Sequence, residues 1–352
     1  MDHELHTSEE IKTVENVEKK LREEAKLLLA EKKVDVLVGY EAGTLPMTAT
    51  PCFITAPEEA DRLVWNAFCV QNLAKFVQDL ISLHRQSQQR VKPEARTRKV
   101  VGVVARGCTT RSLVIQLQER QFNRDDIFVV GVPCGGYVDK CKVAARVAGQ
   151  EIREASLVGD QLSVKTAGEA KTLPLGEILA DNCLTCRFNN PVISDLMIGS
   201  PAPAMAPESE YAGVEAHEKL SLAERWSYFE KEMAKCIRCN ACRQVCPSCY
   251  CPVCFAEQSQ PQWVGISEDE TDTQVFQIMR LYHMVGRCVD CGSCVAVCPM
   301  GVDLRTFLKK LDKDVFELFG NRAGSSLEDL PPLSQFKEDD REDFIYDPQK
   351  AK

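Results

Sequence analysis

Two runs of cysteine with identical spacing dominate the chemistry available to this chain of 352 residues. Each run has the form C-x2-C-x2-C-x3-C-P, in which three thiolates hold one iron–sulfur cube and the fourth ligates the neighbouring cube. The proline that closes each run fixes φ and turns the chain away from the cluster loop. We therefore expect two 4Fe–4S clusters. One is predicted to be held by Cys236, Cys239, Cys242 and Cys298, and the other by Cys288, Cys291, Cys294 and Cys246.

Zinc sites and disulfides are the alternatives for these runs. Zinc ribbons use pairs of C-x2-C, not two complete runs of four cysteines with a proline after each. Disulfides need an oxidising compartment, of which the sequence gives no sign. Three more cysteines, Cys249, Cys251 and Cys254, lie between the runs. A metal-binding role and a role as small apolar side chains around the cluster both stay open for them.

A third group of cysteines lies in the N-terminal half. Cys108 and Cys134 each follow a predicted parallel strand, and such strand ends meet at one edge of a sheet. The C-x2-C pair Cys183 and Cys186 supplies two more thiols, so these four predict a third 4Fe–4S cluster. Zinc is an alternative with the same ligands. A further alternative makes Cys108 a thiolate nucleophile at a helix N-terminus. We expect Cys69 to be no ligand.

The elements that position these thiols follow from hydrophobic periodicity. Residues 100–105 and 127–132 predict buried strands, and 109–121 predicts the helix between them. Strand, helix and strand at this spacing form a βαβ unit with parallel strands. Residues 154–167 predict a hairpin that turns at 159–160.

The segment before this unit is expected to hold a strand over 34–38 that ends in a turn at Gly39. A loop containing Pro46 and Pro51 and a helix over 58–89, broken near 69–71, are expected to follow.

Helices are predicted on both sides of the two cysteine runs, over 220–235, 271–285 and 303–319. Flanking helices favour an α-helical ferredoxin over the compact β-hairpin kind. The predicted fold is thus an α/β N-terminal domain with a βαβ unit, followed by an all-α (α-helical ferredoxin) iron–sulfur domain. The predicted boundaries are an N-terminal amphipathic helix over 1–33, the α/β domain over 34–199, a Pro/Ala-rich linker over 200–215, the dicluster ferredoxin domain over 216–320, and an acidic, flexible tail over 321–352.

Composition limits the function classes. The net charge of −9 argues against nucleic-acid binding, which needs a basic face. Apolar runs fall short of the roughly 20 residues that span a bilayer, and the charged N-terminus does not resemble a signal peptide. We therefore expect a cytoplasmic protein without a membrane span.

Three blocks of sequence resemble a known family. They are Gly107-Cys108-Thr-Thr-Arg111-Ser, Gly131-Val-Pro-Cys134-Gly-Gly, and Cys183-Leu-Thr-Cys186-Arg-Phe with Ser194-Asp195-Leu-Met-Ile-Gly199. They are similar to blocks of the beta subunits of deazaflavin-coenzyme-reducing hydrogenases and formate dehydrogenases, in a shorter form. That resemblance implies an iron–sulfur cluster and FAD. Cys298-Pro-Met-Gly301-Val-Asp303-Leu resembles the α-helical dicluster ferredoxin of the heterodisulfide reductase small subunit.

The clusters and these resemblances together predict an electron-transfer subunit of an anaerobic multi-subunit oxidoreductase of the hydrogenase, formate dehydrogenase or heterodisulfide reductase type. Its partners would be a flavoprotein, hydrogenase or formate dehydrogenase subunit. The alternative is an enzyme that uses bound flavin and clusters to act on a reduced deazaflavin or nicotinamide. No catalytic residue is predicted for it.

Overall fold

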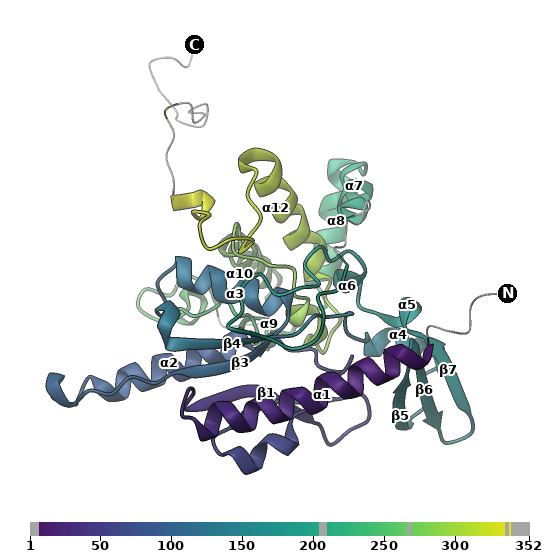
Figure 1. The fold of residues 1–352 in the computed structure, drawn as a ribbon. Helices are drawn as coiled ribbons and strands as arrows, with labels where there is room; N and C mark the ends of the chain where they lie inside the picture. The colour runs from purple at the N-terminus through teal and green to yellow at the C-terminus, as the bar shows by residue number, and fades with distance from the viewer. Residues whose placement is uncertain (1–6, 204–209, 266–268, 335–337, 339–352) are drawn as a thin grey trace.

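A five-stranded sheet forms the centre of the N-terminal half of the computed structural model, which describes residues 7–203, 210–265, 269–334 and 338 (Figure 1). Its strand order is β2-β1-β3-β4-β8. The parallel strands are β1 (Val36–Ala42), β3 (Val101–Ala105), β4 (Ile127–Gly131) and β8 (Leu196–Met197), and β2 (Ala49–Ile54) is an antiparallel edge strand. The sheet thus presents the carboxyl ends of four parallel strands at one edge.

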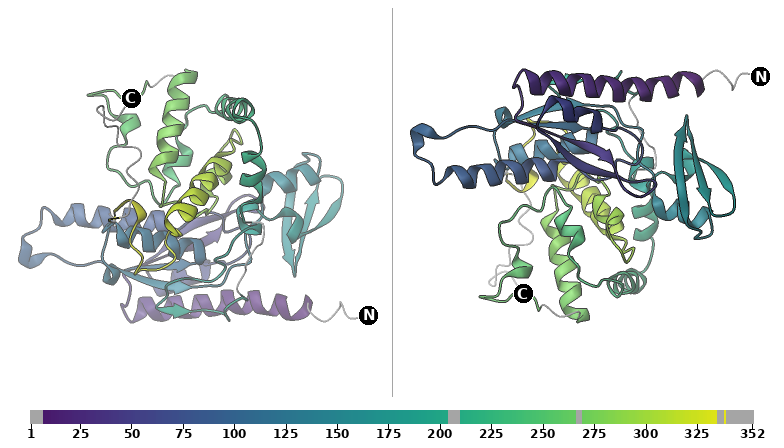
Figure 2. Two further views of the ribbon diagram at one scale, coloured as in Figure 1. Left: turned by 90° about the horizontal axis from the view of Figure 1, so that it is seen from above. Right: turned by 90° about the horizontal axis from the view of Figure 1, so that it is seen from below.

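The predicted βαβ unit is confirmed. β3 pairs in parallel with β4, with Val103 opposite Val129, and helix α3 (Gly107–Gln118) joins them. Valine-rich strands of this kind are buried on both faces, because helices cover a parallel sheet on either side. Here α1 (Thr7–Ala30) covers one face, and α2 (Ala74–Gln88) and α3 cover the other (Figure 2).

Helix α1 packs against the sheet because its apolar residues recur at helical spacing. Leu21, Ala25 and Leu28 are all buried and join Leu37 and Val104 in one core cluster. The prediction of an amphipathic helix before the first strand is therefore confirmed.

The expected hairpin belongs to a second, antiparallel sheet of three strands. β5 (Ile152–Val158) pairs with β6 (Gln161–Thr166), and β6 pairs with β7 (Ala170–Pro174). The turn at Gly159, with φ of 61°, lies where the sequence predicted it. Two short helices pack against this sheet, α4 (Lys140–Arg146) and α5 (Leu175–Ile178), and α6 (Asp181–Leu184) follows them in the chain.

The segment before α2 differs from the prediction. Gly39 is not a turn but lies inside β1, where an added Cβ would stand 2.3 Å from Leu63 Cδ2. The expected loop around Pro51 is strand β2, since an edge strand tolerates proline. The expected helix over 58–89 is reduced to the turn η1 (Pro57–Arg62) and to α2.

The C-terminal half is helical, as predicted. Its helices are α7 (Ala212–Glu218), α8 (Leu222–Met233), α9 (Ala241–Gln244), α10 (Glu270–His283), α11 (Ser293–Ala296) and α12 (Leu304–Phe319). Single helical turns in this half are η4 (Phe255–Glu257) and η5 (Pro332–Ser334). The N-terminal half has further single turns at η2 (Pro93–Ala95) and η3 (Arg124–Asp126). Both ends of α8, α10 and α12 lie within two residues of the three predicted helices. None of the described helices is long and apolar enough to cross a membrane.

Helix α3 joins the two halves (Figure 1). Arg111 donates hydrogen bonds to the carbonyl oxygens of Ala323 (2.9 Å) and Val289 (3.0 Å). Gln116 donates to the carbonyl of Pro247 at 2.7 Å. These buried side chains satisfy backbone acceptors of the C-terminal half, so the halves share one polar, hydrogen-bonded interface.

The beginning of the predicted flexible tail is also part of this interface. Gln118 donates to the carbonyl of Ser326 at 2.9 Å, and Ala323 is 3% exposed. Gly324, with φ of 68°, lies so close to α3 that an added Cβ would stand 2.2 Å from the carbonyl oxygen of Arg111. Residues 335–337 and 339–352 of that tail, and 204–209 of the predicted linker, lie outside the described residues.

Candidate iron–sulfur sites

The two cysteine runs have the same backbone conformation. In the first run Arg238 and Asn240, on either side of Cys239, have φ of 50° and 59°. In the second run Asp290 and Gly292, on either side of Cys291, have φ of 53° and 72°. Left-handed residues occur singly and mark tight turns. Each loop therefore folds around its middle cysteine in the same way before a short helix, α9 or α11, begins.

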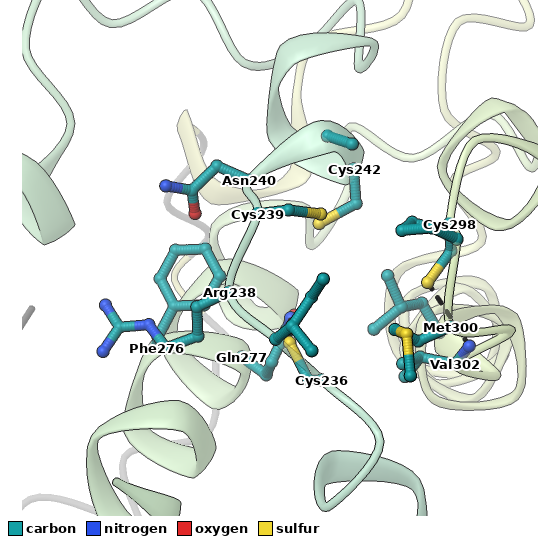
Figure 3. A pocket seen from close by; sticks show the side chains of 14 residues that line it. Cys236, Arg238, Cys239, Asn240, Cys242, Phe276, Gln277, Cys298, Met300 and Val302 are labelled. Atoms are coloured by element: carbon teal, nitrogen blue, oxygen red, sulfur yellow. Dashed lines mark hydrogen bonds between the residues drawn. The ribbon is translucent and has the colours of Figure 1, made fainter. Parts of the chain in front are cut away.

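The first candidate site, site 1, is a cavity lined by Cys236, Cys239, Cys242 and Cys298 (Figure 3). Gln277 of α10 donates from Nε2 to Cys236 Sγ at 3.4 Å, and the backbone N–H of Val302 donates to Cys298 Sγ at 3.4 Å. N–H groups directed at ligand sulfurs are a common surrounding of iron–sulfur clusters and tune their potentials. Site 1 thus combines thiol ligands with donors that suit their charged form.

The second candidate site, site 2, is a cavity lined by Cys246, Cys288, Cys291 and Cys294. Burial raises the pKa of Cys291 to about 11 and that of Cys294 to about 12. Thiols of this kind give up their protons when a metal replaces them. Three arginines, Arg280, Arg287 and Arg305, line the same cavity and bring positive charge to it.

Each cavity therefore brings together three cysteines of one run and the last cysteine of the other, and their assignment as cluster ligands stays a prediction. One apolar cluster encloses both cavities. It contains Phe229, Met233, Leu281, Met284 and Leu304, with cysteines of both runs packed against it. Within the described chain, no three His, Cys, Asp or Glu side chains converge closely enough to hold a single metal ion.

The third group of cysteines comes together at the carboxyl edge of the five-stranded sheet; we call it site 3. Burial is the main cause that raises the pKa of Cys186 to about 11, and the nearby thiols of Cys108 and Cys134 raise it further. Burial and Cys134 likewise raise the pKa of Cys183. The four thiols predicted for a third cluster are thus near enough to one another to interact electrostatically.

The backbone around site 3 also directs donors at sulfur. The N–H of Gly136 donates to Cys134 Sγ, and that of Phe188 donates to Cys186 Sγ, both at 3.3 Å. The N–H of Cys134 links the two cysteine loops, because it donates to the carbonyl of Asn189 at 2.8 Å. The donor set of site 3 therefore fits a thiolate-bound cluster as well as that of site 1 does.

Sites 2 and 3 are neighbours across the interface between the halves. Cys108 of site 3 and Cys291 of site 2 pack against the same small group of buried residues: Ile115, Val289 and Ala323. Asn182, next to Cys183, donates to the carbonyl of Asp290 at 3.3 Å. Site 2 thus shares one cluster of packed residues with site 1 and another with site 3.

The remaining cysteines lie in different surroundings. The thiol of Cys249 forms a hydrogen bond that lowers the pKa of Cys246, so Cys249 adjoins site 2. Cys254 packs in a small apolar cluster with Phe255, whereas Cys251 is exposed. Cys69 is buried beside the carbonyl of Val64, away from the cavity-lining residues of sites 1 and 2.

Sequence reasoning missed the buried polar residues around the sites. Gln277 and Arg280 are 1% and 3% exposed. Arg106, which directly precedes the helix that carries Cys108 of site 3, is also 3% exposed. Arg106 donates to the carbonyls of Cys69 and Val70. The helical spacing of the sequence does place Gln277 and Arg280 on the apolar side of α10. It does not show, however, whether a charged residue at the edge of that apolar face is buried or exposed.

Comparison with known proteins agrees with this geometry. Residues 231–302, which include both cysteine runs, match the 4Fe-4S dicluster domain family. The C-terminal half of the chain therefore contains a 4Fe–4S dicluster domain.

The similarity extends over most of the chain in particular relatives. The F420-dependent formate dehydrogenase subunit beta of Methanocaldococcus jannaschii is 22% identical over 370 aligned positions, covering 88% of this chain and 92% of the relative. The F420-dependent formate dehydrogenase 1 subunit beta of Methanococcus maripaludis is 22% identical over 371 positions, covering 88% and 91%. The resemblance to formate dehydrogenase beta subunits is confirmed.

One solved structure, of the F420-reducing [NiFe] hydrogenase complex of Methanosarcina barkeri, aligns with 50% of this chain and 64% of its own, at 17% identity and a TM-score of 0.33. The resemblance to the heterodisulfide reductase small subunit stays a prediction.

Proposed function

We propose that the chain is the iron–sulfur electron-transfer subunit of a multi-subunit oxidoreductase. The observation that carries this proposal is the composition of the two cavities, each lined by three cysteines of one run and one of the other. With 4Fe–4S clusters bound, sites 1 and 2 would supply single-electron chemistry. The protein contributes the apolar enclosure, the N–H donors and the arginines that set how readily each site accepts an electron.

A third cluster at Cys108, Cys134, Cys183 and Cys186 extends the proposal. The packing of Cys108 and Cys291 against the same buried residues supports a linear order in which site 2 stands between sites 1 and 3. In this order the dicluster domain and the carboxyl edge of the sheet form one conducting path through the molecule.

Exposure supports site 1 as the outer end of that path. Cys239 is exposed, and two apolar side chains near it, Ile237 and Met300, are 45% and 43% exposed. A redox partner could therefore approach site 1 without displacing packed structure. Because the curated relatives are subunits of formate dehydrogenases, we propose that a catalytic oxidoreductase subunit of that kind is the partner.

Iron and acid-labile sulfide per chain test the proposal in protein purified without oxygen. Two clusters require about eight of each and three require about twelve. Protein that is colourless and carries zinc would refute the proposal. Acid extraction of flavin in the same preparation tests the FAD that the resemblance implied: about one flavin per chain would favour an enzyme with its own hydride chemistry.

A further inference from the structure

Arg280 is a buried positive charge without a carboxylate partner in the described structure. It lies on α10 and is 3% exposed. Its Nη2 donates to the carbonyl of Cys242 at 2.9 Å, whereas its Nε and Nη1 have no hydrogen-bond partner among the described residues. A buried, unpaired charge raises the free energy of the folded protein, so an anion beside the guanidinium of Arg280 would stabilise it.

The other two arginines of site 2 do not share this feature. Arg287 forms two hydrogen bonds with the carboxylate of Glu119, at 2.6 and 2.7 Å. Arg305 forms two with the carboxylate of Asp290, both at 2.8 Å. Their charges are neutralised within the protein, so Arg280 alone among the three is directed at the cavity with its charge uncompensated.

The position of Arg280 also relates it to both cluster sites. It lines site 2, and it binds the backbone of Cys242, which lines site 1. The guanidinium is thus bonded to the loop of site 1, but among the two cavities only that of site 2 has it in its wall.

We propose that Arg280 is the counter-charge of the site 2 cluster and sets its reduction potential. This inference rests on the proposed function, because the anion it requires is a thiolate-bound cluster, which gains one more negative charge on reduction. A cation in the wall of the site favours the reduced form, since opposite charges attract strongly in a buried environment. Arg280 therefore makes site 2 an easier acceptor than its thiolates alone would allow.

Three variants separate charge from packing: Arg280→Gln and Arg280→Met remove the charge, and Arg280→Lys keeps it. Reduction is followed in the full chain by an EPR-monitored redox titration. The signals of sites 1 and 2 are assigned by their loss in Cys239→Ala (site 1) and Cys291→Ala (site 2). At a fixed potential, the neutral variants should lower the reduced-to-oxidised ratio of site 2 about tenfold or more, which is about 59 mV for one electron. Arg280→Lys should change it about threefold or less.

Arg287→Gln is the matched control, because Arg287 lines the same cavity but is paired and its side chain is 23% exposed. Water screens an exposed charge, so we expect about a threefold effect or less. Neutral Arg280 variants that keep both clusters at unchanged potentials would overturn the inference. If the neutral variants lose iron, Arg280→Lys decides: retention of both clusters supports the counter-charge role, and loss of iron there too would overturn it. Unsubstituted protein without iron would refute the proposed function itself.

Discussion

Gly292 is the residue at which the contact between sites 2 and 3 can be perturbed most directly. It has φ of 72°, and a Cβ added to it would lie 2.2 Å from Tyr137 Oη and 2.4 Å from Asn182 Oδ1. Those two atoms are held in place, because Tyr137 donates to Asn182 at 2.9 Å and both residues are buried. Gly292→Ala must therefore push the second cysteine loop away from the site 3 loops.

The magnitude has two parts. A left-handed alanine costs about 1–2 kcal/mol relative to its preferred conformation. The overlap at the packed interface adds about 1–3 kcal/mol, the usual cost of inserting a methyl group into a filled space. Gly301→Ala is the control, because Gly301 has φ of 59° but nothing within 4 Å of an added Cβ, so alanine there carries only the conformational cost. The difference in stability between the two variants therefore measures the cost of the overlap.

Thermal unfolding of anaerobic protein, followed by loss of visible cluster absorbance, measures the difference. At about 2–4 °C per kcal/mol for domains of this size, Gly292→Ala should melt about 2–12 °C below Gly301→Ala. Equal melting temperatures for the two variants would refute the close packing of site 2 against site 3. A loss of stability in Gly301→Ala alone would refute it as well.

Four further variants test individual residues. Cys291→Ala should remove about four irons per chain, whereas Cys69→Ala should leave the iron content unchanged, as measured by metal analysis; iron lost from Cys69→Ala would contradict the ligand assignment. Gln277→Leu removes the N–H bond to Cys236, so the site 1 potential should become more negative while that of site 2 stays the same in a redox titration. Glu210→Gln should destabilise the chain by about 3 kcal/mol at pH 7 in chemical denaturation, because Arg187, Lys309 and Arg322 all lose the carboxylate of Glu210, although Lys309 keeps those of Asp290 and Asp312. Burial alone would raise the pKa of Glu210, but these cations hold it below 4.5, so the stabilisation is present above that pH and is lost as the pH falls through the lowered value. A difference between Glu210→Gln and the unsubstituted chain that grew on acidification would be inconsistent with this pairing.

The strong periodic signals in the sequence were sufficient for much of the fold. The βαβ unit was predictable because residues 100–105 and 127–132 are continuous apolar runs around a clear helix. The edge strand β2 was not, since Pro51 and its neighbours give the pattern of a loop until pairing with β1 supplies the hydrogen bonds. Residues 63–73 contain an apolar run that helix propensity favours, but tertiary contacts hold it in an irregular conformation.

The cysteines that line the two cavities followed from spacing alone, because four thiols at fixed separations define a ligand set without knowledge of the fold. The polar residues around them did not. Arg280 lies at a helical position that suits either a core or its edge, and its burial depends on two loops about 40 residues apart in the chain. The bonds from α3 to the C-terminal half join residues more than 100 positions apart, which no local pattern encodes.

Helix α3 fixes the geometry of electron passage. Its Arg111 and Gln116 hold backbone carbonyls beside both sides of site 2, so the halves have no hinge between them along this helix. The spacing between sites 2 and 3 is consequently fixed by the folded chain. If electrons pass between the halves as proposed, control over their flow would have to act where another protein docks rather than by a movement of one half against the other.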